Sequence, residues 1–287
     1  MKRPIQLFSL LLSATLVFGL TACTNNPRGA VTSVTLNETA LTIPITGTER
    51  LSVTIAPADA TNRNITWTSS NPAVATVAAN GVITTLSTGT TTITVTSECG
   101  AHTASCTVTV VEIPAISASL DGVVIAGIRW ATRNVYTPGV FAESPTVAGA
   151  FYQWNRRKNW ADTGAITGWD GTFPAEAEWE AHTNPCPEGW RVPTRQELQT
   201  LNDLGSVWIT YNGVAGRLFG SAPNYIFLPA VGFRSTSGAF AGIGYVGDFW
   251  SSEQDTAEHA WTLWISSGGS DVVSNPKANG SSVRCVI

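Results

Sequence analysis

Residues 31–112 alternate apolar and polar side chains in short runs, and this pattern restricts the first part of the chain to β-structure. In one run, Leu51, Val53 and Ile55 stand two positions apart, which places them on the same face of a strand. Turn-forming pairs such as Asn80-Gly81 separate the runs at short intervals. Short strands joined by frequent turns are typical of an antiparallel sandwich. We therefore predict a small β-sandwich over residues 31–112.

A family resemblance in this part rests on two segments. They are ITWTSSNPAVATV (residues 65–77) and NGVITTLSTGTTTITVTS (residues 80–97). Both resemble the group 2 bacterial immunoglobulin-like domain. Known members of that family are spacers or adhesive modules on cell surfaces, so the resemblance implies a stalk.

The N-terminus has the layout of a secretory signal. Two basic residues precede a largely apolar run over residues 5–20, which is too short and wrongly flanked for a stable membrane span. The ending LTAC resembles a bacterial lipobox, and this resemblance implies cleavage before Cys23 and acylation of that residue. We expect a signal peptide over residues 1–22 and a tether over residues 23–30, with membrane contact through the lipid anchor only. An ordinary secreted protein is the alternative.

The cysteines fit an oxidising compartment. With Cys23 assigned to lipid, four of the five cysteines remain, and four cysteines allow three pairings. Cys99 and Cys106 each lie on the apolar face of a predicted strand, so we predict that a disulfide between them closes a hairpin. A redox-active pair is the alternative, but it lacks the two-residue spacing. Cys186 and Cys285 remain for the second part of the chain.

One helix is predicted to begin within the segment PCPEGWRVPTRQEL (residues 185–198). Thr194 and Glu197 have the spacing of a capping box, so the helix begins at Arg195. Three leucines then recur at a spacing that places them on one helix face, and Gly205 supplies the stop. The leucines are Leu198, Leu201 and Leu204.

The second part of the chain begins after a linker predicted at residues 113–118, and it differs in composition. Ten of the eleven tryptophans follow this linker, so large aromatic side chains are buried between irregular segments. Strands are predicted at several places in this part, among them residues 123–130 and 282–287.

Six segments over residues 119–287 resemble the Fibrobacter-type major paralogous domain, in the expected order. They are IRWATRNV (128–135), AGAFYQWNRRKNW (148–160), PCPEGWRVPTRQEL (185–198), FLPAVGFR (227–234), DFWSSE (248–253) and SVRCV (282–286). That family is similar to C-type lectin-like folds, in which a long disulfide ties the first helix region to the last strand. The resemblance implies such a bond between Cys186 and Cys285. The fold class is then mainly β: an N-terminal Ig-like β-sandwich followed by a β-rich α+β C-type lectin-like domain.

A ligand-binding surface is predicted in the segment WNRRKNW (residues 154–160) and at one tryptophan beyond it. Indole faces and planar guanidinium groups suit the apolar face and hydroxyl rim of a sugar, or an aromatic and acidic protein partner. The alternative is that the tryptophans pack in the core and the charges form a solvated turn. The candidate ligand-binding residues are Trp154, Arg156, Arg157, Trp160 and Trp169.

Charge and motifs disfavour several other classes of protein. A net charge of −4 with 13% charged residues supplies no basic field for nucleic acid. The calcium-binding triplets of C-type lectins are missing, so we expect no metal and no cofactor, although an acidic stretch over residues 170–180 is an alternative cation site. We predict no catalytic residue. As a nucleophile, Cys186 would need a free thiolate beside a base such as His182.

The order of tether, spacer and aromatic-rich terminal domain predicts an outer-membrane lipoprotein of the bacterial cell envelope, facing either the outside or the periplasm. The expected function is non-catalytic adhesion through recognition of a glycan or a surface protein. Two alternatives remain. One is a structural component of a pilus or envelope complex, and the other is an enzyme resembling the formylglycine-generating enzymes, which share a related irregular fold and use cysteines.

Overall fold

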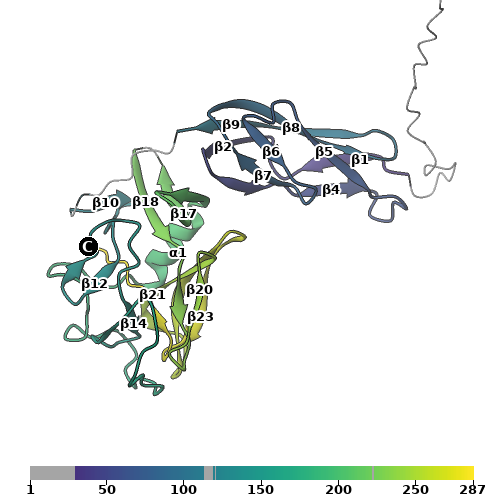
Figure 1. The fold of residues 1–287 in the computed structure, drawn as a ribbon. Coiled ribbons are helices and arrows are strands. Elements are labelled where there is room, and N and C mark those ends of the chain that lie inside the picture. The colour runs from purple at the N-terminus through teal and green to yellow at the C-terminus, as the bar shows by residue number, and fades with distance from the viewer. Residues whose placement is uncertain (1–29, 113–118, 120, 222) are drawn as a thin grey trace, which may run out of the picture.

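The structure, a computed structural model, describes residues 30–112, 119, 121–221 and 223–287 (Figure 1). The predicted signal peptide, the lipidation of Cys23, nearly all of the tether and the predicted linker lie outside the described residues. Within the described ranges, no helix is long and apolar enough to cross a membrane. The architecture there is mainly β, with one α-helix.

The N-terminal part is a β-sandwich of nine strands (Figure 1). One sheet has the order β2-β9-β8-β5, and β3, β7 and β6 pair in the sheet that packs against it. Ile43, Ile83 and Ile93 are fully buried between the two layers. The alternating pattern predicts this sandwich, but not that β2 and β9 pair in parallel. The strands are β1 (Ser33–Leu36), β2 (Ala40–Pro44), β3 (Thr48–Arg50), β4 (Val53–Ala56), β5 (Ile65–Ser69), β6 (Ala75–Val77), β7 (Val82–Thr85), β8 (Gly89–Ser97) and β9 (Thr103–Val111).

The predicted disulfide between Cys99 and Cys106 is wrong, because the hairpin has a different register. Cys106 lies opposite Ile93, and its thiol is free and buried, which raises the pKa of that thiol. β8 ends at Ser97, whose hydroxyl donates to the Cys99 carbonyl at 2.8 Å and accepts from the His102 amide at 3.0 Å. Cys99 therefore lies in the turn after β8 and is not paired with Cys106.

The C-terminal part packs two larger sheets around one helix. An eight-stranded sheet has the order β15-β14-β24-β19-β21-β22-β23, with β20 paired to β19. Strands β16, β17 and β18 form an antiparallel meander, and α1 packs against this meander and against β21, β22 and β23. Two short hairpins, β10–β11 and β12–β13, form sheets of their own.

The bounds of these elements follow the chain. They are β10 (Val123–Ile125), β11 (Ile128–Trp130), β12 (Val135–Thr137), β13 (Val140–Phe141), β14 (Phe151–Gln153), β15 (Asn159–Trp160), α1 (Arg195–Asp203), β16 (Ser206–Tyr211), β17 (Val214–Ser221), β18 (Asn224–Pro229), β19 (Val231–Arg234), β20 (Phe240–Ile243), β21 (Val246–Gln254), β22 (His259–Ser266), β23 (Gly269–Pro276) and β24 (Gly280–Ser281).

The helix begins where the capping box predicts. The Thr194 hydroxyl accepts from the Glu197 amide at 3.1 Å, and the Glu197 carboxylate accepts from the Thr194 amide at 2.8 Å. The first two predicted leucines are buried, but Leu204 is 53% exposed. Leu204 is the C-cap, and the chain leaves the helix there because Gly205 takes a φ of +75°.

Two predicted strands have a different form. Residues 123–130 make the hairpin β10–β11 instead of one strand, because Ala126 and Gly127 take φ values of +50° and +82° and reverse the chain. Residues 282–287 run as irregular backbone held by isolated bridges, including one between Arg191 and Val286.

Three buried cations organise the irregular loops of the C-terminal part. Arg234 donates to four backbone carbonyl groups, three of them in residues 161–164. Lys277 donates to two loop carbonyls and to the side chain of Gln254, and Arg284 donates to two carbonyls and twice to a side-chain amide oxygen. Burial lowers the pKa of each cation, that of Arg284 to about 9. Long loops can pack here because buried donors satisfy carbonyl groups that no strand ladder reaches.

The two parts of the chain contact each other through a shared sheet. Strand β3 of the sandwich pairs with β16 at Thr48 and Trp208, and the Thr46 hydroxyl donates to the Thr210 carbonyl at 3.1 Å. Val207 of β16 packs against the core of the sandwich. The order β18-β17-β16-β3-β7-β6 therefore crosses the junction between the two parts.

Asp248, in the middle of β21, is fully buried. Its carboxylate accepts from the Ser281 hydroxyl at 2.6 Å and from the Asn275 amide at 3.3 Å. Burial raises the pKa of this carboxyl from 3.8 to about 6, although the hydrogen bonds act in the opposite direction.

We expect the stability of the C-terminal part to fall as the pH rises through the pKa of Asp248. Because the folded pKa lies above the unfolded one, the protonated group's contribution is fully present below pH 3.8 and is lost as the pH rises through about 6. The change amounts to about 3 kcal/mol. Asp248→Asn removes the titrating group, so its unfolding free energy relative to wild type should increase over this pH range. Urea unfolding at several pH values across this range measures the difference. Asp203→Asn, which changes an exposed carboxylate, is the control. If the difference between Asp248→Asn and wild type stays constant with pH, the raised pKa of Asp248 is wrong.

Candidate functional site

The predicted binding residues do not share one surface, and Trp154 is the clearest correction. Its side chain is 0% exposed, and its indole N–H donates to the Ser251 carbonyl at 3.0 Å. Its ring lies 5.9 Å from the ring of Trp179, between centroids, and 4.5 Å from the ammonium nitrogen of Lys277. An enclosed side chain cannot contact a ligand, so the predicted binding role of Trp154 is wrong.

Trp160 and Trp169 pack against each other, with ring centroids 4.9 Å apart. Trp160 is buried, and the ammonium group of Lys158 lies 3.8 Å from its ring centroid. Its predicted ligand contact is therefore wrong as well. Trp169 is half-buried, and its indole N–H donates to the Thr236 carbonyl at 3.0 Å.

Arg156 uses its donors to fold a neighbouring loop. It forms an ion pair with Asp170, and it donates to the Thr172 carbonyl at 3.2 Å and to the Thr172 hydroxyl at 2.8 Å. The backbone amide of Thr172 and the guanidinium of Arg156 lower the pKa of the Asp170 carboxyl to about 2. The acidic residue at the start of the alternative cation site is thus engaged by an arginine.

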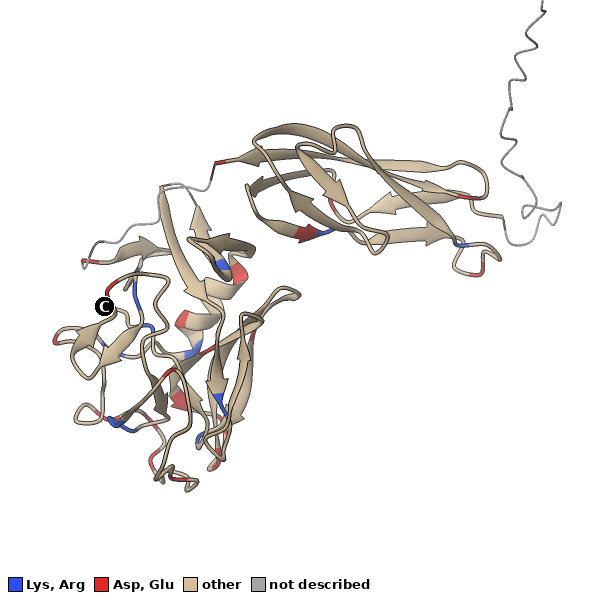
Figure 2. Cartoon of the chain, in the orientation of Figure 1, with Lys and Arg blue, Asp and Glu red and all other residues tan. Residues whose placement is uncertain are grey.

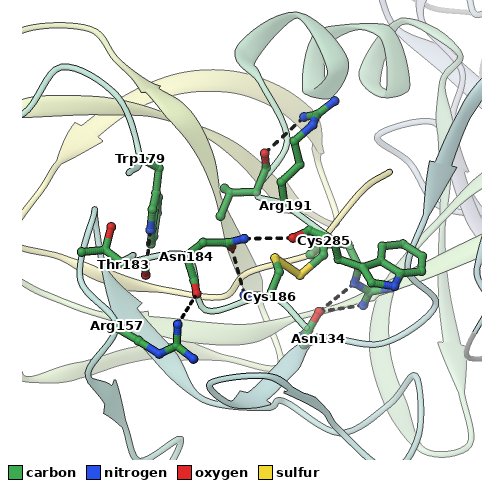
Figure 3. Close-up of a disulfide and its surroundings, with 11 residues drawn as sticks. Asn134, Arg157, Trp179, Thr183, Asn184, Cys186, Arg191 and Cys285 are labelled. Carbon is green, nitrogen blue, oxygen red and sulfur yellow. Dashed lines mark hydrogen bonds between the residues drawn. A yellow bond between two sulfur atoms is a disulfide. The ribbon is translucent and has the colours of Figure 1, made fainter. Parts of the chain in front are cut away.

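Arg157 is exposed and supports the segment that contains the first disulfide cysteine (Figure 3). Its guanidinium donates to the backbone carbonyl of Asn184 at 3.2 Å. The Asn184 side chain donates to the Trp190 carbonyl at 2.9 Å and accepts from the Cys186 amide at 3.0 Å. Arg157 therefore helps to hold residues 184–190 in place through its hydrogen bond to Asn184.

Pro187 and Trp190, at the two ends of the turn over residues 187–190, line one wall of an open cleft of about 810 Å³, and the hairpin β12–β13 forms the other wall. Figure 1 places β12 in the C-terminal part, on the side away from the sandwich. Among the lining residues are Arg133, Tyr136, Phe141, Glu143, Pro187 and Trp190.

Two turns hold the walls of the cleft. In the first, the Trp190 amide donates to the Pro187 carbonyl at 2.9 Å, and Gly189 takes a φ of +81°. In the second, Gly139 takes a φ of +87°, and its amide donates to the Pro185 carbonyl at 2.9 Å. This last bond joins the hairpin to the segment that leads into the other wall. Both turns favour glycine, because residues with a side chain are strained at these φ values.

The cleft combines aromatic side chains with one acid and one base. Tyr136 is 52% exposed, while Phe141 and Trp190 are half-buried and meet edge to face, with centroids 5.5 Å apart. The guanidinium of Arg133 bonds to a carbonyl of the hairpin at 3.4 Å. Glu143 is exposed and has no hydrogen bond or ion pair within the described residues. The surface therefore offers ring faces, a guanidinium donor and a free carboxylate. Figure 2 shows both signs of charge scattered among the loops of this part.

The disulfide between Cys186 and Cys285 fixes the base of the first wall, and the predicted pairing is confirmed (Figure 3). The second wall is tied to the same last segment of the chain. Arg284 donates to the side-chain oxygen of Asn134 at 2.9 and 2.7 Å, and the Asn134 carbonyl accepts from the Ala142 amide at 2.8 Å. Residues next to the C-terminal cysteine thus position both walls.

Sequence reasoning missed the cleft. The turn at Pro138-Gly139 and the turn at residues 187–190 are both visible as proline and glycine pairs, and Trp190 lies in a family motif. What the sequence does not show is that the two turns meet in space. The bond from Gly139 to Pro185 exists only in the folded chain.

Comparison with protein families identifies the family of the first part of the chain. The profile described as bacterial Ig-like domain (group 2) matches residues 30–108. Residues 30–108 are a group 2 bacterial Ig-like domain. The resemblance stated for this part is thereby confirmed, and the cleft lies outside the Ig-like domain.

Curated relatives share a segment of about the same size with this chain. An alpha-L-arabinofuranosidase of Bifidobacterium longum subsp. longum is 42% identical over 80 residues, which are 27% of this chain and 8% of that protein. An Ig-like virion protein of Serratia phage KSP90 is 44% identical over 82 residues, 28% of this chain and 32% of that protein. The chain spans less than a tenth of the first two curated relatives and about a third of the third, so their activities are not transferred to it.

Solved structures give only distant matches. Domains 4 and 5 of the S-layer protein SbsC match 29% of this chain and 53% of that chain, with 21% identity and a TM-score of 0.26. An intimin mutant of EHEC O157:H7 matches 86% of this chain and 87% of that chain, with 15% identity and a TM-score of 0.21. TM-scores this low support no inference about fold or function.

Proposed function

We propose that the protein is a lipoprotein of the bacterial outer membrane, in which the Ig-like domain is a spacer and a C-type lectin-like domain recognises a glycan or a surface protein. The observation that carries the proposal is the open, aromatic-lined cleft on the C-terminal domain. The long disulfide between the segment before α1 and the last residues supports the lectin-like assignment, because that resemblance implies such a bond.

The proposed recognition is non-catalytic. Cys186 is the candidate nucleophile of the enzyme alternative, and its sulfur is bonded to that of Cys285. A disulfide sulfur supplies no thiolate for attack on a substrate.

Recognition through the cleft predicts that Tyr136→Ala weakens binding of the full chain to its target surface at least tenfold. The reason is the loss of an exposed ring, and aromatic side chains contribute strongly to binding. Retention of labelled protein on bacterial cells, host cells and extracellular matrix measures this effect. Phe173→Ala is the matched control, because that ring is 41% exposed and lies outside the cleft. Unchanged binding by Tyr136→Ala contradicts the proposed site.

Lipid attachment predicts that the wild-type chain takes up labelled palmitate and fractionates with membranes, whereas Cys23→Ser does neither. Acyl chains gain about 0.8 kcal/mol per buried methylene, so several chains give a lasting anchor. Protease treatment of whole cells then shows which side of the membrane the C-terminal domain faces. A wild-type chain without label would rule out the anchor.

A structural role in a surface assembly is the second candidate, and it is favoured by one exposed apolar pair. Ile243 is 59% exposed and Tyr245 is 77% exposed, and both lie where β20 turns into β21. Apolar side chains exposed together suit contact with another protein. Crosslinking in intact cells tests this candidate: a stoichiometric bacterial partner that Ile243→Ser and Tyr245→Ala abolish would favour assembly over adhesion.

A further inference from the structure

We propose that the cleft binds an uncharged saccharide, with a ring face packed on its aromatic side chains and adjacent hydroxyl groups bonded to Arg133 and Glu143. This inference rests on the proposed function and selects one class of ligand for the same site.

The apolar part of the lining suits the ring face of a sugar. Tyr136 and Val140 are 52% and 53% exposed, and half-buried Phe141 and Trp190 lie beside them. Pyranose rings carry a face of C–H groups, and such a face packs on rigid aromatic surfaces at a low cost in side-chain entropy. Ligand sites commonly have this composition, with a mainly apolar lining and a few polar groups that set orientation.

The polar part of the lining selects hydroxyl groups over a charged ligand. Arg133 brings a planar fork of donors, and Glu143 brings two acceptor oxygens that are unengaged within the described residues. Each sugar hydroxyl is one donor and two acceptors, so two adjacent hydroxyls can bond to both side chains. Arg133 and Glu143 act with opposite sign on any net charge of a ligand, so their long-range attraction and repulsion largely cancel. The pair therefore gives a charged ligand little advantage, while both side chains remain partners for neutral hydroxyl groups.

A hydrogen bond and a disulfide hold the segments that form the two walls in the folded chain. Gly139 and Gly189 hold tight turns, and a bond of 2.9 Å joins Gly139 to Pro185. The disulfide fixes the residue before Pro187. Small and weakly held ligands such as sugars benefit from a site that needs no ordering on binding, because that entropy is already lost on folding.

An extended peptide fits the cleft less well. Binding of a peptide as an added strand depends on a row of main-chain hydrogen bonds. The strands that line the cleft, β12 and β13, are three and two residues long and pair with each other. A peptide would therefore gain few main-chain hydrogen bonds here and would rely on side-chain contacts. A sugar uses the same side chains and needs no strand edge.

The test uses the full chain carrying Cys23→Ser and a panel of defined probes. The uncharged probes are methyl glycosides of glucose, galactose, mannose and N-acetylglucosamine, and the charged probes are sialic acid and choline. Saturation-transfer NMR and tryptophan fluorescence titration measure binding. We expect at least one uncharged glycoside to bind, and Tyr136→Ala and Glu143→Gln each to weaken that binding at least tenfold. Glu188→Gln is the matched control, since this exposed carboxylate lies in the turn but does not line the cleft.

Three results would overturn the inference: no binding of any uncharged glycoside, tighter binding of a charged probe, or an equal loss in Glu188→Gln. Far-ultraviolet circular dichroism of each variant shows whether a loss reflects misfolding. Cell binding that depends on Tyr136 but is not inhibited by any glycoside would refute the saccharide while leaving the proposed function in place. Cell binding that Tyr136→Ala leaves unchanged, together with no glycoside binding, would refute both.

Discussion

Replacing Cys186 and Cys285 together with alanine is expected to lower the unfolding free energy of the C-terminal domain by about 4 to 5 kcal/mol. The bond joins residues 99 positions apart, and in the chain-entropy model closing a loop of about that length is worth about 4.7 kcal/mol. Alanine is the better replacement because both cysteines are buried, and serine would leave two hydroxyl groups there. Urea unfolding followed by tryptophan fluorescence measures the loss.

The control for this prediction is Cys106→Ala, which removes a buried thiol without opening a loop. It should cost about 1 kcal/mol, the usual size of a small core change. The double variant should also bind its target more weakly, because the wall at residues 187–190 loses its covalent attachment. A double variant as stable as Cys106→Ala would show that the disulfide does not hold the domain together.

The two predicted disulfides show how far the sequence determines the fold. For Cys186 and Cys285, a resemblance over the whole C-terminal part implies the pairing, and the structure contains it. For Cys99 and Cys106, the prediction rests only on the alternation of side chains along two strands, which puts each cysteine on an apolar face. Alternation gives the face on which a side chain lies, but not its partner across the hairpin. The turn sets that register, and it places Cys106 opposite Ile93.

Rules that involve residues close together in the sequence predict the helix but not the cleft. The capping box at Thr194 and Glu197 involves residues three apart, so the sequence alone predicts the helix start. The cleft instead depends on contacts between segments far apart in the chain, such as the bond from Gly139 to Pro185. No turn or periodicity rule gives such a contact.

The segment WNRRKNW illustrates the same limit for a binding surface. Its composition is compatible with indoles on the surface or in the core, and the choice depends on distant residues. Ser251 accepts the indole N–H of Trp154, and Lys277 covers its ring. These partners lie about a hundred residues further along the chain, so the sequence could name the aromatic residues but not the side that they face.

Trp154→Ala is expected to lower the unfolding free energy of the C-terminal domain by about 3 to 5 kcal/mol, the usual cost of emptying a buried aromatic site. The change opens a cavity beside Trp179 and leaves the Ser251 carbonyl without its donor. It also exposes one side of Lys277, whose ammonium group holds the loop carbonyls of Pro174 and Glu176 at 3.3 and 3.1 Å. Urea unfolding measures the cost, and faster proteolysis of residues 170–180 should accompany it.

Two controls separate this packing role of Trp154 from a binding role. Trp154→Phe keeps most of the apolar volume and loses only the N–H donor, so it should cost about 1 to 2 kcal/mol. Arg157→Ala removes an exposed side chain and should cost under about 1 kcal/mol, because one surface hydrogen bond is lost. If Trp154→Ala were instead as stable as Arg157→Ala and bound its target more weakly, the indole would have to reach the surface, and the burial of this side chain would be refuted.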